Sequence, residues 1–165
     1  MSRVGNTRNL ASGNKYDLLI FDFPDGYPNG GISLKFGDTP KRISGVEKVV
    51  QTFIKILMTV KSSDVIHNRT GTEFPTLTGA YNLSASGSTE IRSVAAGAVT
   101  QAETMAKSVL NIPGTDSTGQ LLSATILSID TVGDSLSISI QILTKAGESA
   151  PIAVPFTSLG IQVNE

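Results

Sequence analysis

The stretch that most constrains the fold of this chain is a pair of alternating segments joined by only two residues. Residues 121–132 (LLSATILSIDTV) and 135–144 (SLSISIQILT) flank Gly133-Asp134. A two-residue connection with glycine first favours a type II′ β-hairpin, and such a turn sets the register of both strands. The register predicted from the turn pairs Val132 with Ser135, Ile129 with Ile138, Leu127 with Ile140 and Thr125 with Ile142. The last three pairs share one face, so the turn and the hydrophobic pattern predict the same hairpin.

Two other stretches have apolar residues at helical spacing. The first is expected at 44–59, where Ser44-x-x-Glu47 has the capping-box pattern in which each side chain binds an orphan amide of the first turn. The second is expected at about 88–110, before Pro113 and Gly114. Its apolar face is formed by Ile91, Val94, Ala95, Ala98, Ala102, Met105 and Val109.

The remaining segments complete an α+β fold. Short strands are expected at 16–23 and 32–37, a loop-rich middle at 61–87, a loop at 145–150 and a candidate edge strand at 152–163. Pro155 suits an edge because proline cannot donate to a sheet ladder. We therefore expect two main helices packed on one face of a mainly antiparallel sheet that includes the C-terminal β-hairpin. Residues 1–16 are expected to form a flexible or extended arm, and 17–165 a single α+β domain.

Composition excludes several classes of function. Lys and Arg total 13 against 14 for Asp and Glu, and no basic cluster suitable for phosphates is present, so nucleic-acid binding is not expected. The chain has no cysteine, which excludes disulfides, Cys-type zinc sites and a Cys nucleophile. No apolar run approaches the length of a membrane span. Charged residues make up 16%, against about 25% in typical soluble domains. Partners often cover a surface that is poor in charge, although Ser/Thr-rich strands of a monomer have the same composition.

The only histidine, His67, lies in a polar segment between the two predicted helices. A Ser–His–acid triad needs an oriented base, and Asp64, Asp130 or Asp134 could orient this one. No nucleophile elbow accompanies it, so we expect a polar loop histidine with no catalytic role.

Two carboxylate arrangements offer other chemistry. Asp22, Asp25 and Asp38 bracket a turn rich in Gly and Pro and could offer oxygen ligands to calcium, but their spacing matches no known calcium loop. Glycoside hydrolysis needs two carboxyls about 5 to 9 Å apart. Glu73, next to an aromatic residue that favours the protonated acid, could pair with Asp64 in that role. A peptidoglycan-cleaving enzyme therefore remains an alternative.

The order of motifs resembles a known family. A short strand near Phe23-Pro24 is followed by a helix ending in ILMT (56–59), then RTGT (69–72), FPTL (74–77), an alanine-rich helix and a serine-rich hairpin. Over about residues 20–145 this order resembles the baseplate wedge family of contractile phage tails, the gene-25-like or W-protein family, which has a relative in type VI secretion baseplates. Leu57-Met58-Thr59 matches the end of the family's first helix, and Gly71-Thr72 matches its Gly-Thr step.

The chain departs from the family pattern in three places. Ser62-Ser63-Asp64 stands where the family often has Gly-Glu-Arg, and Arg69-Thr70 replaces a proline and an aromatic residue. NIPGTDSTGQLL (111–122) lacks the family's Glu-Pro-Arg, which is linked to docking of the sheath or of neighbouring wedge proteins. These departures affect the expected details of sheath contact most.

The resemblance implies a structural component of the virion, not an enzyme, that needs no cofactor or metal and assembles in the host cytoplasm. Its implied partners are other wedge proteins, the hub and spike, and the first ring of tail sheath, with neither nucleic acid nor membrane. Family analogy implies that the sheath joins by strand exchange, for which 152–163 is the candidate edge; an edge merely protected by Pro155 is the alternative. A generic α+β binding module also remains open. The candidate interaction residues are Val49, Phe53, Thr59, Gly71, Thr72, Ile161 and Val163.

Overall fold

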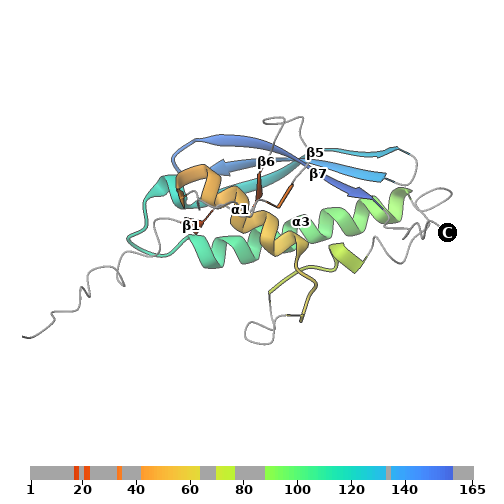
Figure 1. Cartoon of the computed structure of the whole chain (residues 1–165), viewed down its shortest axis with the longest axis horizontal. Coiled ribbons are helices and arrows are strands. Elements are labelled where there is room, and N and C mark those ends of the chain that lie inside the picture. The colour runs from red at the N-terminus through yellow and green to blue at the C-terminus, as the bar shows by residue number, and fades with distance from the viewer. Residues whose placement is uncertain are drawn as a thin grey trace, which may run out of the picture.

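The computed structural model of the chain describes residues 17–18, 21–22, 33–34, 42–63, 70–76, 88–132 and 135–157. Two helices and a three-stranded antiparallel sheet form its main body (Figure 1). The expected arm at 1–16 and the candidate residues Ile161 and Val163 lie outside the described residues. The main elements are α1 (Gly45–Met58), α3 (Ser88–Leu110), the short 3₁₀ helix η2 (Ser117–Gly119), β5 (Leu121–Val132), β6 (Ser135–Thr144) and β7 (Ser149–Thr157).

Both helices form where the apolar spacing predicts them, but the expected capping box does not. Ser44 occupies the N-cap position of α1 with extended backbone, yet its side chain makes no capping hydrogen bond. The next residue, Gly45, has a φ of +58°, which lies outside the right-handed helical region. With Gly45 in this conformation, the first turn of α1 lacks the geometry in which the side chain of a capping serine binds a backbone amide.

The inward face of α3 differs from its predicted face at the C-terminal end. Val109 was expected inside but is 49% exposed, whereas Leu110 is buried. Buried positions there follow a four-residue spacing through Ala102, Ala106 and Leu110, so the last turn points Val109 outward.

The hairpin has the predicted bounds, and its register is confirmed next to the turn. Val132 pairs with Ser135, and Ile129 pairs with Ile138. Farther from the turn the prediction is wrong, because β5 contains register shifts between Ile126 and Ser128 and between Leu121 and Ser123.

The shift at Leu127 moves the pairing of β5 by one residue. Ile126 faces Ile140, and Ala124 faces Ile142, in the places expected for Leu127 and Thr125. Leu127 is the extra residue of this bulge and is 56% exposed. A bulge inserts one unpaired residue, which the alternation of apolar residues alone does not reveal.

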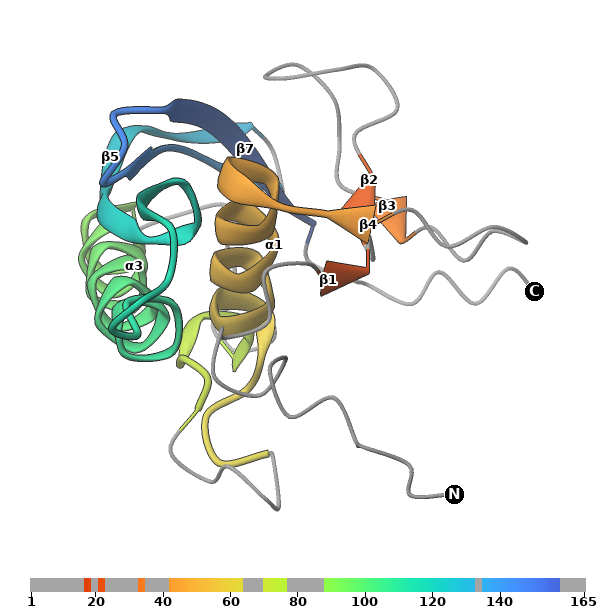
Figure 2. The ribbon, with the colours of Figure 1, turned by 90° about the vertical axis from the view of Figure 1, so that its left-hand side faces the viewer.

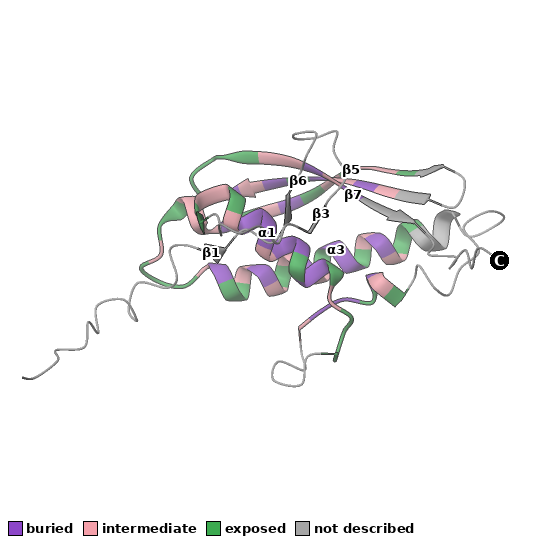
Figure 3. Cartoon of the chain, in the orientation of Figure 1, coloured by how far each residue is buried: buried purple, intermediate pink, exposed green. Residues whose placement is uncertain are grey.

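The helices cover one face of the sheet, as the α+β prediction requires. α1 and α3 pack against each other; α3 lies against β5, and α1 against β6 and β7 (Figure 2). Buried positions follow the inner sides of both helices and of the sheet (Figure 3). The largest fully buried side chains are Phe53, Phe74, Ile43, Ile54, Leu57, Leu121, Ile138, Ile140, Ile142, Ile152 and Val49. Alanines of α3 line its inward face and let this helix approach its neighbours closely.

The described strands of the N-terminal part pair among themselves. β1 (Asp17–Leu18) pairs with β4 (Arg42–Ile43), and β2 (Phe21–Asp22) pairs with β3 (Ser33–Leu34). The run expected as one strand at 16–23 therefore contributes to two different two-stranded sheets. The sequence pattern missed β4, which leads through Ser44 into α1.

Candidate functional site

Two threonines close the C-terminal end of α1. The last carbonyls of a helix have no partner within the helix, so other groups must bind them. The Thr59 hydroxyl donates to the Lys55 carbonyl at 2.6 Å, and the Thr59 amide donates to the Ile56 carbonyl at 3.3 Å. The Thr72 hydroxyl, from the far end of the following loop, donates to the Leu57 carbonyl at 2.7 Å. We call Thr59, Gly71 and Thr72 the clamp.

The clamp also joins the two stems of the loop by backbone hydrogen bonds. Val60 and Thr72 form an isolated parallel bridge. The Thr72 amide donates to the Thr59 carbonyl at 2.8 Å, and the Lys61 amide donates to the Thr72 carbonyl at 3.0 Å. The chain thus returns to the end of α1 and is held there at a defined place.

Gly71 makes this approach possible. Its φ is +102°, a conformation that residues with a side chain rarely adopt. A Cβ at this position would lie 2.6 Å from the Thr59 carbonyl oxygen and 2.8 Å from that of Val60. Both contacts are with backbone atoms, which cannot turn aside as a side chain could. Glycine is therefore required both by the backbone angle and by the space.

Thr72 is fully buried, and its hydroxyl is used twice. Besides donating to Leu57, it accepts from the Phe74 amide at 3.2 Å. The Phe74 side chain is also fully buried and belongs to the core. The clamp therefore connects the end of α1, the loop and the hydrophobic core.

The carboxyl proposed for wall hydrolysis does not have an apolar environment. The Glu73 side chain is 65% exposed and lies 3.5 Å from the Lys61 ammonium. Its aromatic neighbour, Phe74, points into the core instead. The proposed second carboxyl, Asp64, and the histidine, His67, lie outside the described residues.

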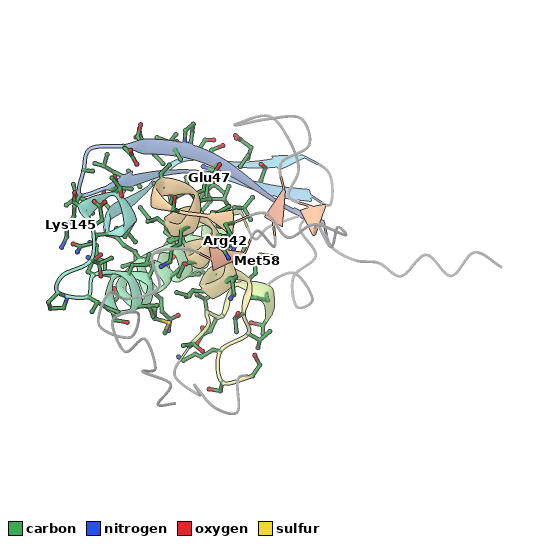
Figure 4. All side chains as sticks on the ribbon, turned by 60° about the vertical axis from the view of Figure 1, so that its left-hand side comes forward. Arg42, Glu47, Met58 and Lys145 are labelled. Carbon is green, nitrogen blue, oxygen red and sulfur yellow. The ribbon has the colours of Figure 1, made fainter. Side chains whose placement is uncertain are left out.

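Two of the candidate interaction residues belong to the core. Val49 and Phe53 both have 0% exposure, so neither offers surface to a partner in the folded chain. The prediction that these two residues contact a partner is therefore wrong, because α3 and the sheet already cover that face of α1. Met58, at the C-terminal end of α1, is 42% exposed. Figure 4 labels this residue and also Glu47, which lies in the first turn of the same helix.

The pattern of the sequence did not reveal an open pocket at the other end of α1. It has a volume of about 690 Å³ and lies between the first turn of the helix, the 114–119 loop and Glu148. Its charged lining residues are Glu47, Lys48, Asp116 and Glu148. Carboxylates outnumber the single ammonium, which opposes the attraction of a helix N-terminus for anions.

The described part of the chain has neither a cluster of metal-ligating side chains nor a helix that could span a membrane. No group of three or more His, Cys, Asp or Glu side chains there could hold a metal ion. Asp22 lies in β2, whereas Asp25 and Asp38, which the calcium alternative also needs, fall outside the described ranges. No helix among the described residues is long and apolar enough to cross a membrane.

Comparisons with protein-family models, with curated proteins and with solved structures found no match to this chain.

Proposed function

We propose that this chain is a structural component of a contractile-tail baseplate wedge. In this role it binds other wedge proteins, the central hub and spike, and the first ring of the tail sheath. The proposal rests on the motif resemblance, and the clamp is the observation that gives the motif a physical reason.

The residues that carry the resemblance act together in the clamp. Thr59 ends α1, and Gly71-Thr72 returns to that end through backbone and side-chain hydrogen bonds. The spacing between the two motifs is therefore the length of loop that leaves the helix and comes back to it. Both threonine hydroxyls donate to carbonyls of α1, so their role is structural.

The sheet offers a surface suited to burial in an assembly. Among the residues of β5, β6 and β7, only Asp130 carries a charge. The face away from the helices presents residues such as Ser123, Ser139 and Gln141. Charged residues are depleted at the centre of protein interfaces, because removing a charge from water costs free energy. A nearly uncharged sheet face therefore suits a protein partner better than it suits a charged ligand.

The test is reconstitution of the baseplate. We expect the purified chain, mixed with the other baseplate proteins of its tail, to enter a complex of defined size, measured by sedimentation and by imaging with this chain labelled. Failure to enter any complex would overturn the proposal. The hydrolase alternative is measured in parallel as loss of turbidity of purified cell wall. Cleavage by the wild type that Glu73→Gln abolishes would support that alternative instead.

A further inference from the structure

The N-terminal segment joins the described part of the chain beside the pocket at the start of α1. β1 pairs antiparallel with β4, and Asp17 lies opposite Ile43. Because the two strands run in opposite directions, the chain that precedes Asp17 heads toward the residues that follow Ile43. These are Ser44 and Gly45, and both line the pocket. Residues 1–16 are therefore attached at the rim of the pocket.

The lining of the pocket is acidic. The carboxylates of Glu47, Asp116 and Glu148 face the single ammonium of Lys48, so three negative charges against one positive charge leave a net charge of −2. Glu148 is exposed, and no ion pair joins its carboxylate to another described residue. A cationic group that enters the pocket would therefore meet an excess of negative charge.

The pocket also has oxygen atoms that can accept hydrogen bonds. A Cβ at Gly45 would lie 3.8 Å from Oε2 of Glu148 and 3.9 Å from Oγ1 of Thr118, so both oxygens face the space that a side chain there would fill. In the wall of the same pocket, Oγ1 of Thr115 is buried and has no hydrogen-bond partner among the described residues. Buried polar atoms normally have a partner, so this oxygen indicates a donor that binds in the pocket.

The segment 1–16 has the complementary charge and donors. It contains Arg3, Arg8 and Lys15 and no acidic residue, so its side chains carry a charge of +3. Arginine and lysine side chains donate hydrogen bonds and accept none, which matches the carboxylates and hydroxyls of the pocket. From Asp17, an extended chain reaches about 7 Å to Lys15 and about 30 Å to Arg8. Both side chains are therefore within reach of the pocket.

We propose that residues 1–16 bind back onto their own chain and occupy the acidic pocket at the start of α1. Continuation of the β1–β4 register places Lys15 opposite Gly45, where its ammonium meets the Glu148 carboxylate. Because the segment is tethered at the rim, its effective concentration at the pocket is about millimolar, which favours it over the same segment of a second copy. The proposal concerns the isolated chain and is independent of the proposed function.

The test locates the segment in solution with a spin label on the full-length chain. Because the chain has no cysteine, Ala11→Cys provides a single site for a nitroxide. We expect the nitroxide to broaden the amide NMR signals of residues 114–119 and of the first turn of α1. The signals of residues 130–132, at the other end of β5, should stay sharp. Sharp signals at 114–119 would overturn the proposal.

Charge variants of the labelled chain distinguish binding from mere proximity. Glu148→Gln removes a carboxylate of the pocket, whereas the control Glu73→Gln removes an exposed carboxylate at the opposite end of α1. We expect Glu148→Gln to weaken binding of the segment about two- to fivefold, measured as loss of broadening at 114–119, and Glu73→Gln to leave it unchanged. Replacement of both Arg8 and Lys15 by glutamine should weaken it further. Equal broadening in the wild type and in all of these variants would contradict docking by charge.

A mixture of two chains distinguishes the chain's own segment from that of a second copy. Isotope-labelled chains without the nitroxide are mixed with nitroxide-bearing chains without the isotope. We expect the signals of residues 114–119 to stay sharp in this mixture, because each segment occupies the pocket of its own chain. Broadening in the mixture would assign the pocket to the segment of a second copy, and the proposal would then be wrong.

Discussion

Single residues decide how the chain turns at the end of α1, and Gly71 is the clearest case. Replacement by alanine would place a Cβ against two backbone carbonyls and force a residue with a side chain to a φ of +102°. We expect Gly71→Ala to lower the free energy of unfolding by about 2–4 kcal/mol, measured by urea denaturation.

Gly97 provides the matched control for that substitution. It lies within α3, and a Cβ there would meet nothing within 4 Å. Alanine is preferred to glycine inside a helix, so Gly97→Ala should raise the free energy of unfolding by about 0.5–1 kcal/mol. Equal effects of the two substitutions would show that the close approach at Gly71 does not hold the clamp.

Substitution of Thr72 tests whether the stability of the clamp depends on one hydroxyl. Thr72→Val keeps the shape of the side chain but leaves the Leu57 carbonyl and the Phe74 amide without that partner. We expect a loss of about 2–4 kcal/mol in the free energy of unfolding, because buried unpaired backbone groups are costly. In the control variant Thr100→Val, which removes an exposed hydroxyl bound to its own helix, the change should stay within about 0.5 kcal/mol. A small change in Thr72→Val would contradict this account.

At the scale of the element, the bulge decides which leucines of β5 belong to the core. Leu121 is fully buried, whereas Leu127 is 56% exposed. Leu121→Ala should therefore lower the free energy of unfolding by about 2–5 kcal/mol, and Leu127→Ala should change it by less than about 0.5 kcal/mol. Denaturation of both variants would decide between the observed register and the unbroken alternation, which places Leu127 inside.

At the scale of the whole molecule, the helices and sheet form two layers around one core. α1 contributes large side chains such as Phe53 and Ile54, whereas α3 contributes mostly alanines. The difference places α3 close to β5 and fills the space under β6 and β7 with the side chains of α1. This packing buries Val49 and Phe53, so a partner of the proposed kind would have to bind other residues of the surface.

Part of the candidate site could be predicted from the sequence. The motif order singled out Thr59, Gly71 and Thr72 as candidate interaction residues, and the structure brings them together in the clamp, where Gly71 and Thr72 are buried. Pro155 marked the 152–163 strand as an edge in the sequence, and the structure pairs both Pro151 and Pro155 of β7 with β6, at Gln141 and Ser137.

Local rules determined the helices and the hairpin, because apolar spacing and a two-residue turn act over a few neighbouring residues. Both strands of the hairpin and the second helix therefore have the bounds predicted for them. The clamp and the bulges were decided only by the tertiary structure. The Thr72 hydroxyl binds a carbonyl 15 residues away, and the bulge at Leu127 places Ile126 among the side chains that pack against the core. Such groups meet only after the layers have packed, so their positions are set by the packed core.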